Sequence, residues 1–146
     1  MSDGFKVERS VLVKESEEKI WDVLTKSEYT KHYMFGCEVI SDWTVGSDIK
    51  FTGRFMGRKM YTRGTVLEYK PYEYIKYSSF DPRLELEDIP ENYIYTSYIL
   101  TKKDEGIEVK FILEILQDSK EVYDETVKSI DRVMIPGFKK ILNIRY

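Results

Sequence analysis

Apolar and polar residues alternate along most of this chain, and the alternation predicts β-strands. Residues 5–14 place their apolar side chains on one face, which is the period of a half-buried strand. The alternation is cleanest at residues 107–117, where every second residue from Ile107 to Ile115 is apolar. Turn residues divide the sequence between these two segments into five further predicted strands, at residues 37–43, 48–55, 59–69, 73–80 and 92–103.

Helical spacing occurs near both ends of the chain. Ser16 is a typical N-cap, and the apolar residues that follow it predict a short helix. Ser27 opens a second short helix, which we expect to run to about Met34. Residues 119–143 carry apolar side chains three or four positions apart and predict the longest helix. We expect a kink at Pro136, because proline removes one backbone hydrogen bond.

The order of these elements predicts an α+β fold with one strand, two short helices, six further antiparallel strands and a long C-terminal helix. A seven-stranded antiparallel sheet can bury its apolar face against a single amphipathic helix only by curling around it. The space between the sheet and the helix is therefore where a ligand would bind. We see no repeat or linker and interpret residues 1–146 as one domain.

Composition narrows the class of protein. The 146 residues are 42% hydrophobic and 34% charged, which excludes a disordered chain. Cys37 is the only cysteine, so an intramolecular disulfide is excluded, and no apolar run approaches the roughly 18 residues that a membrane helix needs. We therefore expect a cytoplasmic protein, either a monomer or a homodimer, without membrane insertion.

The charges are segregated along the chain. The formal net charge of −3 gives no reason to expect nucleic acid as a partner. Residues 49–63 nevertheless carry five basic side chains and no acidic one, whereas residues 81–91 carry five acidic side chains and one arginine. We interpret both runs mainly as solvated faces.

Groups that perform catalysis or hold a metal are scarce. His32 is the only histidine, so a zinc site of histidine and cysteine ligands is excluded, and we expect neither a metal nor a cofactor. Gly53 and Gly57 lack the spacing of a phosphate-binding loop. Glu68 and Glu114 lie on predicted strands, and the sequence does not decide whether either points inward.

Aromatic residues are the unusual feature of the composition. The chain has 12 tyrosines and 7 phenylalanines but no alanine, so large side chains must fill its core. Seven tyrosines fall on predicted strands, and a buried phenol needs a hydrogen-bond partner, which a ligand or a trapped water molecule can supply. An apolar cavity with a few hydroxyl groups is typical of a small-molecule site.

Four motifs occur along the chain in a characteristic order. They are Ser16–Trp21, the Gly46–Ser47 turn, the pattern G-x-V-x-E-x-x-P at Gly64–Pro71, and Gly137–Leu142 in the last helix. This order resembles the START-like or Bet v 1-like superfamily (SRPBCC), in the branch of the C-terminal domain of the activator of heat-shock-protein-90 ATPase. The resemblance covers essentially the whole chain. It implies a helix-grip fold, in which a curved antiparallel sheet wraps around the C-terminal helix and leaves a hydrophobic cavity.

Three functions follow as alternatives. The first is binding of a small hydrophobic molecule in a cavity of at least roughly 300 Å³. Its walls are expected at Tyr77, Tyr98, Phe111, Met134 and Phe138, and its mouth at Tyr33 and Phe35. The second is a protein-interaction role of the chaperone-regulator kind, in which the segregated charges steer a partner. The third is a cyclase-like enzyme, which requires an ionisable group with a perturbed pKa facing the cavity.

Overall fold

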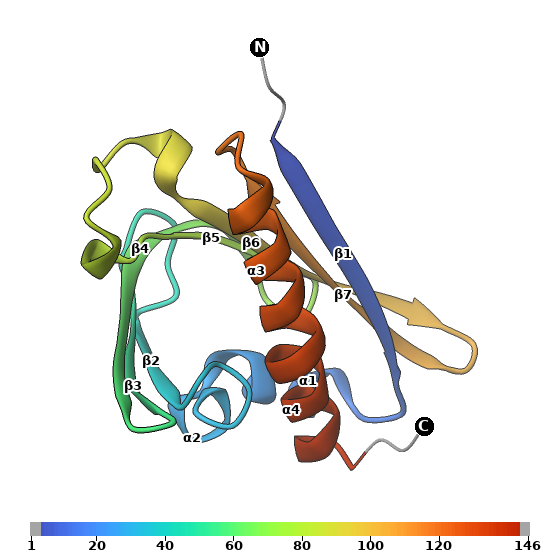
Figure 1. Ribbon diagram of the computed structural model, residues 1–146. Helices are drawn as coiled ribbons and strands as arrows, with labels where there is room; N and C mark the ends of the chain where they lie inside the picture. Colours follow the sequence, from blue (N-terminus) through green and yellow to red (C-terminus); the bar gives the residue numbers. More distant parts are fainter. Residues whose placement is uncertain (1–3, 144–146) are drawn as a thin grey trace.

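One curved antiparallel sheet forms most of the computed structural model, which describes residues 4–143 (Figure 1). The strands lie in the order β1-β7-β6-β5-β4-β3-β2, so β2 to β7 form a meander and β1 returns to pair with β7. This arrangement confirms the predicted α+β fold. The strands are β1 (Phe5–Val13), β2 (Cys37–Ser41), β3 (Asp48–Phe55), β4 (Arg58–Lys70), β5 (Tyr74–Ser79), β6 (Ile94–Lys103) and β7 (Gly106–Ile115).

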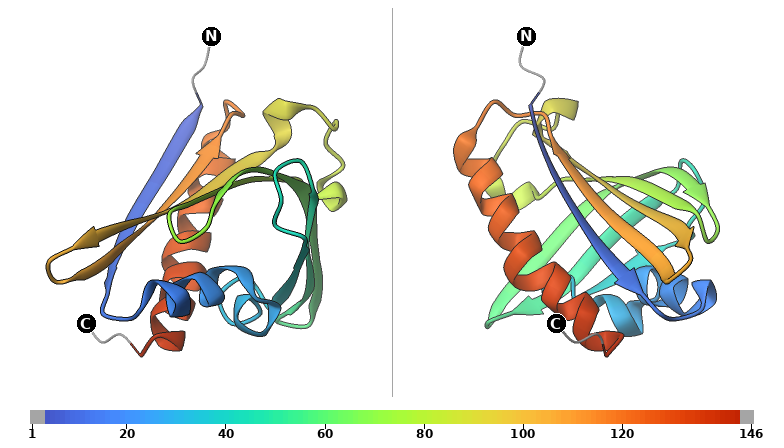
Figure 2. Two further views of the ribbon diagram at one scale, coloured as in Figure 1. Left: turned by 180° about the vertical axis from the view of Figure 1, so that it is seen from behind. Right: turned by 90° about the vertical axis from the view of Figure 1, so that its right-hand side faces the viewer.

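Helices occupy the positions that the sequence predicted. Two short helices, α1 (Glu17–Thr25) and α2 (Ser27–Thr30), follow β1. The C-terminal helix consists of α3 (Lys120–Ser129), a π-helical turn (Ile130–Met134) and α4 (Ile135–Ile141). Figures 1 and 2 show the sheet curving around this helix. None of the helices within residues 4–143 is long and apolar enough to cross a membrane.

A β-bulge interrupts the pairing of the longest strand, β4. Val66 pairs with Tyr77 and Glu68 pairs with Lys76, so Leu67 is an extra residue on β4. Bulges bend a strand and increase its local twist. The bulge therefore helps the sheet to turn toward the C-terminal helix.

The second short helix is shorter than predicted, because the chain already turns toward β2 after Thr30. The Thr30 hydroxyl donates a hydrogen bond to the carbonyl oxygen of Cys37 at 3.0 Å and accepts one from the Val39 amide at 3.1 Å. Phe35 and Gly36 then adopt left-handed backbone angles, with φ of 55° and 71°. These bonds compete with helix continuation, and the left-handed residues reverse the chain.

The C-terminal helix contains a π-helical turn immediately before Pro136. The Ile135 amide donates to the carbonyl oxygen of Ile130, five residues earlier, instead of four. Gly137 follows Pro136 and lies against the connection between α2 and β2. A Cβ added to Gly137 would lie 2.5 Å from the carbonyl oxygen of His32 and 2.9 Å from Cα of Tyr33. Where we expected a kink at Pro136, the structure has a π turn directly before it, and Gly137 permits close contact with the α2–β2 connection.

Aromatic rings form a continuous chain through the core. In order of contact they are Tyr33, Phe138, Phe111, Tyr98, Tyr77 and Phe51, with neighbouring ring centroids 5.0 to 6.0 Å apart. All six rings are at most 5% exposed. The chain of rings links the C-terminal helix to the middle of the sheet and fills much of the space that the sheet encloses.

Candidate functional site

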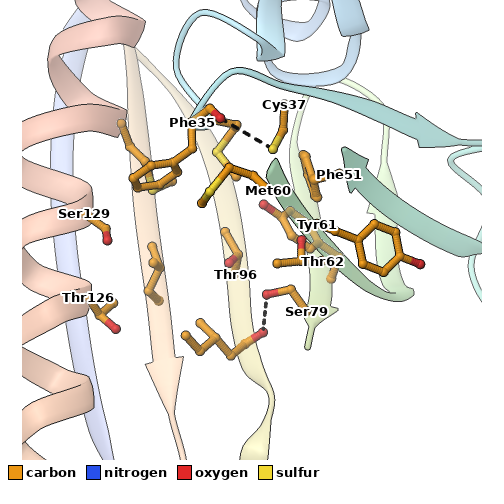
Figure 3. Close-up of a pocket in the computed structure, with 15 residues that line it drawn as sticks. Phe35, Cys37, Phe51, Met60, Tyr61, Thr62, Ser79, Thr96, Thr126 and Ser129 are labelled. Carbon is orange, nitrogen blue, oxygen red and sulfur yellow. Dashed lines mark hydrogen bonds between the residues drawn. The ribbon is translucent and has the colours of Figure 1, made fainter. Parts of the chain in front are cut away.

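A pocket of about 160 Å³ lies between the concave face of the sheet and the C-terminal helix (Figure 3). It is smaller than the roughly 300 Å³ that we expected for a ligand cavity and that drug-sized ligands require. It is close to the size of an engineered cavity of about 150 Å³ that admits a benzene ring. The pocket therefore has room for a ligand of about one ring.

The wall of the pocket is mainly apolar. Its apolar side chains come from the α2–β2 connection, from β3, β4, β6 and β7, and from the π turn: Met34, Phe35, Phe51, Met60, Ile94, Leu113 and Met134. Hydroxyl groups and one thiol complete it, at Cys37, Tyr61, Thr62, Tyr77, Ser79, Thr96, Thr126 and Ser129. None of these 15 lining residues carries a carboxylate, ammonium, guanidinium or imidazole group.

Three of the seven residues that we expected at the site line this pocket. They are Phe35, Tyr77 and Met134. The expected wall residues Tyr98, Phe111 and Phe138 lie outside the lining and belong to the chain of core rings. Their rings pack against one another and occupy the deep end of the space between sheet and helix, which explains the small volume of the pocket.

Tyr33 does not lie at a mouth. Its side chain is 1% exposed, and its hydroxyl donates a hydrogen bond to the carbonyl oxygen of Leu24 at 2.9 Å. Its ring packs edge-on against Phe138. Tyr33 is thus a core residue that ties α1 to the C-terminal helix, whereas the neighbouring Phe35 does reach the pocket.

Sequence reasoning missed the serine and threonine hydroxyl groups of the pocket. Ser79 and Thr96 come from β5 and β6, and Thr126 and Ser129 come from α3 (Figure 3). Thr126 falls on the same helical stripe as the buried Ile130 and Met134, at intervals of four residues. A polar residue inside an otherwise apolar stripe was the signal available in the sequence.

The hydroxyl group of Tyr77, which lines the pocket, shares a hydrogen bond with that of Tyr98 in the core. The hydroxyl oxygens of Tyr77 and Tyr98 are 2.9 Å apart. Burial raises the pKa of Tyr77 to about 12 and raises the pKa of Tyr98 well above its ordinary value. Burial also raises the pKa of the Cys37 thiol to about 11. These groups are therefore protonated and neutral near pH 7.

The two strand carboxylates that the sequence left open face away from the pocket. Glu68 is exposed. Glu114 alternates with the buried Leu113 and Ile115, and its carboxylate lies 3.7 Å from the ammonium group of Lys76. Neither carboxylate is placed to act as an acid or base in the pocket.

The acidic segment, residues 81–91, contacts the basic hairpin, residues 49–63. Arg63 donates to the Asp88 carboxylate at 2.8 Å, and the Tyr93 hydroxyl donates to the same carboxylate at 2.6 Å. Arg83 also donates a hydrogen bond to the carbonyl oxygen of Lys59. The segregated charges therefore partly neutralise each other within the molecule, which reduces the charge left to steer a partner.

A curved antiparallel sheet that grips a C-terminal helix, with an apolar pocket between them, defines a helix-grip domain. Residues 14–144 match the model of the family described as Activator of Hsp90 ATPase homolog 1-like protein. The chain belongs to this family, which confirms the resemblance found in the sequence. Among curated proteins, none matches the chain.

Several solved structures share the fold over almost their whole length. The solution structure of ChR145 from Cytophaga hutchinsonii is 29% identical, with a TM-score of 0.80 and coverage of 98% of this chain and 97% of the other. SA2116 from Staphylococcus aureus, a protein of unknown function, is 17% identical, with a TM-score of 0.75 and coverage of 95% and 93%. PFC0360w from Plasmodium falciparum, an HSP90 activator, is 15% identical, with a TM-score of 0.69 and coverage of 99% of both chains.

Proposed function

We propose that this protein binds a small apolar molecule, about one ring in size, in the pocket between the sheet and the C-terminal helix. The observation that carries the proposal is the pocket itself, which combines an apolar wall with a few hydroxyl groups between the sheet and the C-terminal helix. An apolar pocket of about 160 Å³ leaves apolar side chains in contact with water, and covering them with an apolar ligand is favourable.

The chemistry of the wall favours binding over catalysis. The titratable side chains in the wall are Cys37, Tyr61 and Tyr77, and burial raises the pKa of both Cys37 and Tyr77. General acid–base catalysis works best with a group whose pKa lies near the working pH. A wall of apolar atoms and neutral hydroxyl groups supports a role as a binding module.

The proposal is tested by calorimetric titration of the chain with toluene. We expect saturable binding at one site. Ser129→Leu places a larger side chain in the pocket and should weaken toluene binding at least about tenfold, because the ring and the leucine compete for the same space. Lys128→Leu, at the exposed neighbouring position, is the matched control and should bind like the parent chain. Absence of toluene binding, or equal binding by both variants, contradicts the proposal.

A second candidate function is binding to a chaperone of the Hsp90 class. The family name and the HSP90 activator among the structural relatives support it. The surface that favours it is the β3–β4 hairpin tip, which we define as Arg54, Met56, Arg58 and Lys59. Met56 is 87% exposed and stands at a turn with φ of 52°, flanked by exposed cations. Methionine and arginine are enriched at protein interfaces.

This second function is tested with purified Hsp90 at low and high salt. Binding through the hairpin tip should weaken with salt, because its charges are exposed. Met56→Ser together with Arg58→Glu should weaken binding further. Lys120→Glu, an exposed position at the start of α3, is the charge-matched control for Arg58→Glu. An affinity for Hsp90 that changes neither with salt nor in the hairpin variant would argue against this surface.

A further inference from the structure

We infer that the pocket selects a neutral single-ring molecule that carries a hydroxyl group, as phenol does. This inference rests on the proposed small-molecule function and adds the polarity of the ligand. It follows from the direction of the hydrogen bonds that three hydroxyl groups in the wall, those of Ser79, Thr126 and Ser129, already make.

Three hydroxyl groups in the wall have committed their protons to the backbone. Thr126 donates to the carbonyl oxygen of Val122 at 2.8 Å, and Ser129 donates to that of Glu125 at 3.0 Å. Ser79 donates to the carbonyl oxygen of Ile94 at 3.4 Å (Figure 3). The direction of each bond is certain, because a carbonyl oxygen has no proton to give.

A hydroxyl group that has donated its proton keeps its lone pairs. Each of these oxygens can therefore accept a hydrogen bond from a ligand but cannot donate one. Thr126 and Ser129 are three residues apart and share one face of α3, while Ser79 comes from the sheet (Figure 3). The pocket thus offers acceptor oxygens from both of its walls.

Charge excludes the common anionic alternatives. The 15 lining residues contain no cationic side chain, so a carboxylate or phosphate in the pocket would lose its hydration without gaining a partner charge. The oxygens of Ser79, Thr126 and Ser129, which have no proton left to donate, would also repel a carboxylate. A neutral ligand with an O–H donor meets neither penalty and can bond to Thr126, Ser129 or Ser79.

Three methionines give the wall room to adjust to such a ring. Met34, Met60 and Met134 come from the α2–β2 connection, from β4 and from the π turn. Methionine is unbranched and polarisable, and its sulfur makes favourable contacts with aromatic rings. The apolar part of the wall therefore suits an aromatic ring, and the hydroxyl groups suit its polar substituent.

The test compares phenol, toluene and benzoate as probes of the parent chain at pH 7. We expect phenol and toluene to bind and benzoate to bind at least tenfold more weakly than phenol. Anisole, in which a methyl group replaces the phenolic proton, should also bind more weakly than phenol. This comparison needs no variant, so it holds even where a substitution impairs folding. Equal binding of phenol and anisole, or binding of benzoate as tight as that of phenol, overturns the inference.

Two variants locate the acceptor. Thr126→Val combined with Ser129→Ala removes the helix oxygens, and Ser79→Ala removes the sheet oxygen. At least one of them should weaken phenol binding about three- to tenfold and leave toluene binding within about twofold. Thr101→Val, at an exposed position on β6, is the matched control.

The outcomes separate the two claims. If toluene binds but phenol affinity is unchanged in both variants, the ligand polarity is wrong and the proposed binding function stands. If neither phenol nor toluene binds the parent chain, the proposed function itself fails.

Discussion

At the scale of single residues, the interior is organised by tyrosine hydroxyl groups that pair with each other or with the backbone. Tyr77 bonds to Tyr98, and Tyr33 bonds to the carbonyl oxygen of Leu24. No buried side-chain nitrogen or oxygen within the described residues lacks a hydrogen-bond partner. These phenols therefore find their hydrogen-bond partners within the protein, where the sequence had suggested a ligand or a trapped water molecule as the partner.

The buried phenol of Tyr77 makes the free energy of unfolding fall at alkaline pH. Burial raises the pKa of Tyr77 from 10 to about 12 in the folded chain, so the unfolded chain loses this proton first. The stability contributed by the neutral phenol is present below pH 10 and is lost as pH rises toward 12. We expect urea unfolding to show a loss of about 2 to 3 kcal/mol from Tyr77 over this range.

The control is Tyr77→Phe, which removes this ionisable group and keeps the ring. Its free energy of unfolding should fall less steeply between pH 10 and 12 than that of the parent chain. Parallel curves for the two proteins would mean that Tyr77 ionises as easily in the folded as in the unfolded state.

The sequence predicted which residues face the space between the sheet and the helix, but not which of them line the pocket. Tyr77 and Met134 were expected at the cavity and do line the pocket. Tyr98 and Phe138 were also expected there, because their inward orientation follows from strand and helix periodicity. Periodicity gives the direction of a side chain but not its depth, so it does not separate a residue that lines a void from one that fills it.

At the scale of elements, prediction succeeded wherever a regular period was long. The seven strands and the C-terminal helix lie at the predicted positions within a few residues. The end of the second short helix was less predictable, because it depends on contacts with a later segment of the chain. Hydrogen bonds that join Thr30 to Cys37 and Val39 of β2 accompany the end of this helix, and no local pattern encodes them.

Gly137 gives the clearest prediction at this scale. In an ordinary helix, Gly→Ala is expected to stabilise by up to about 1 kcal/mol. Here the added Cβ would clash with the backbone of His32 and Tyr33, so α4 must shift away from the α2–β2 connection. We expect Gly137→Ala to lower the free energy of unfolding by about 1 kcal/mol or more, measured by urea denaturation.

Asp124→Ala is the matched control for Gly137→Ala. Asp124 lies on α3, is exposed, and its carboxylate is 3.9 Å from the Lys120 ammonium group, a surface pair of little energetic weight. Its replacement should change stability by less than about 0.5 kcal/mol. A stabilising effect of Gly137→Ala would show that the close approach of α4 is not required.

At the scale of the whole molecule, the fold supplies a pocket and the side chains set its size. Between the curved sheet and the C-terminal helix lies a chain of six buried aromatic rings, with a pocket of about 160 Å³ beside it. A chain without alanine builds its core from large side chains, and here they fill the deep end. The volume that is left matches one ring, which is why we propose a smaller ligand than the sequence indicated.

Methionine methyl groups provide the most direct measurement of this account. Met34, Met60 and Met134 line the pocket, and the exposed Met56 serves as an internal reference in the same spectrum. The measurement is an NMR titration of the chain, labelled with ¹³C at the methionine methyl groups, with phenol. The account predicts saturable shifts and phenol-to-methyl cross-relaxation at the three pocket methionines, with Met56 unchanged. Shifts confined to Met56, or shifts that grow without saturation at Met56 as well as at the three pocket methionines, would contradict it.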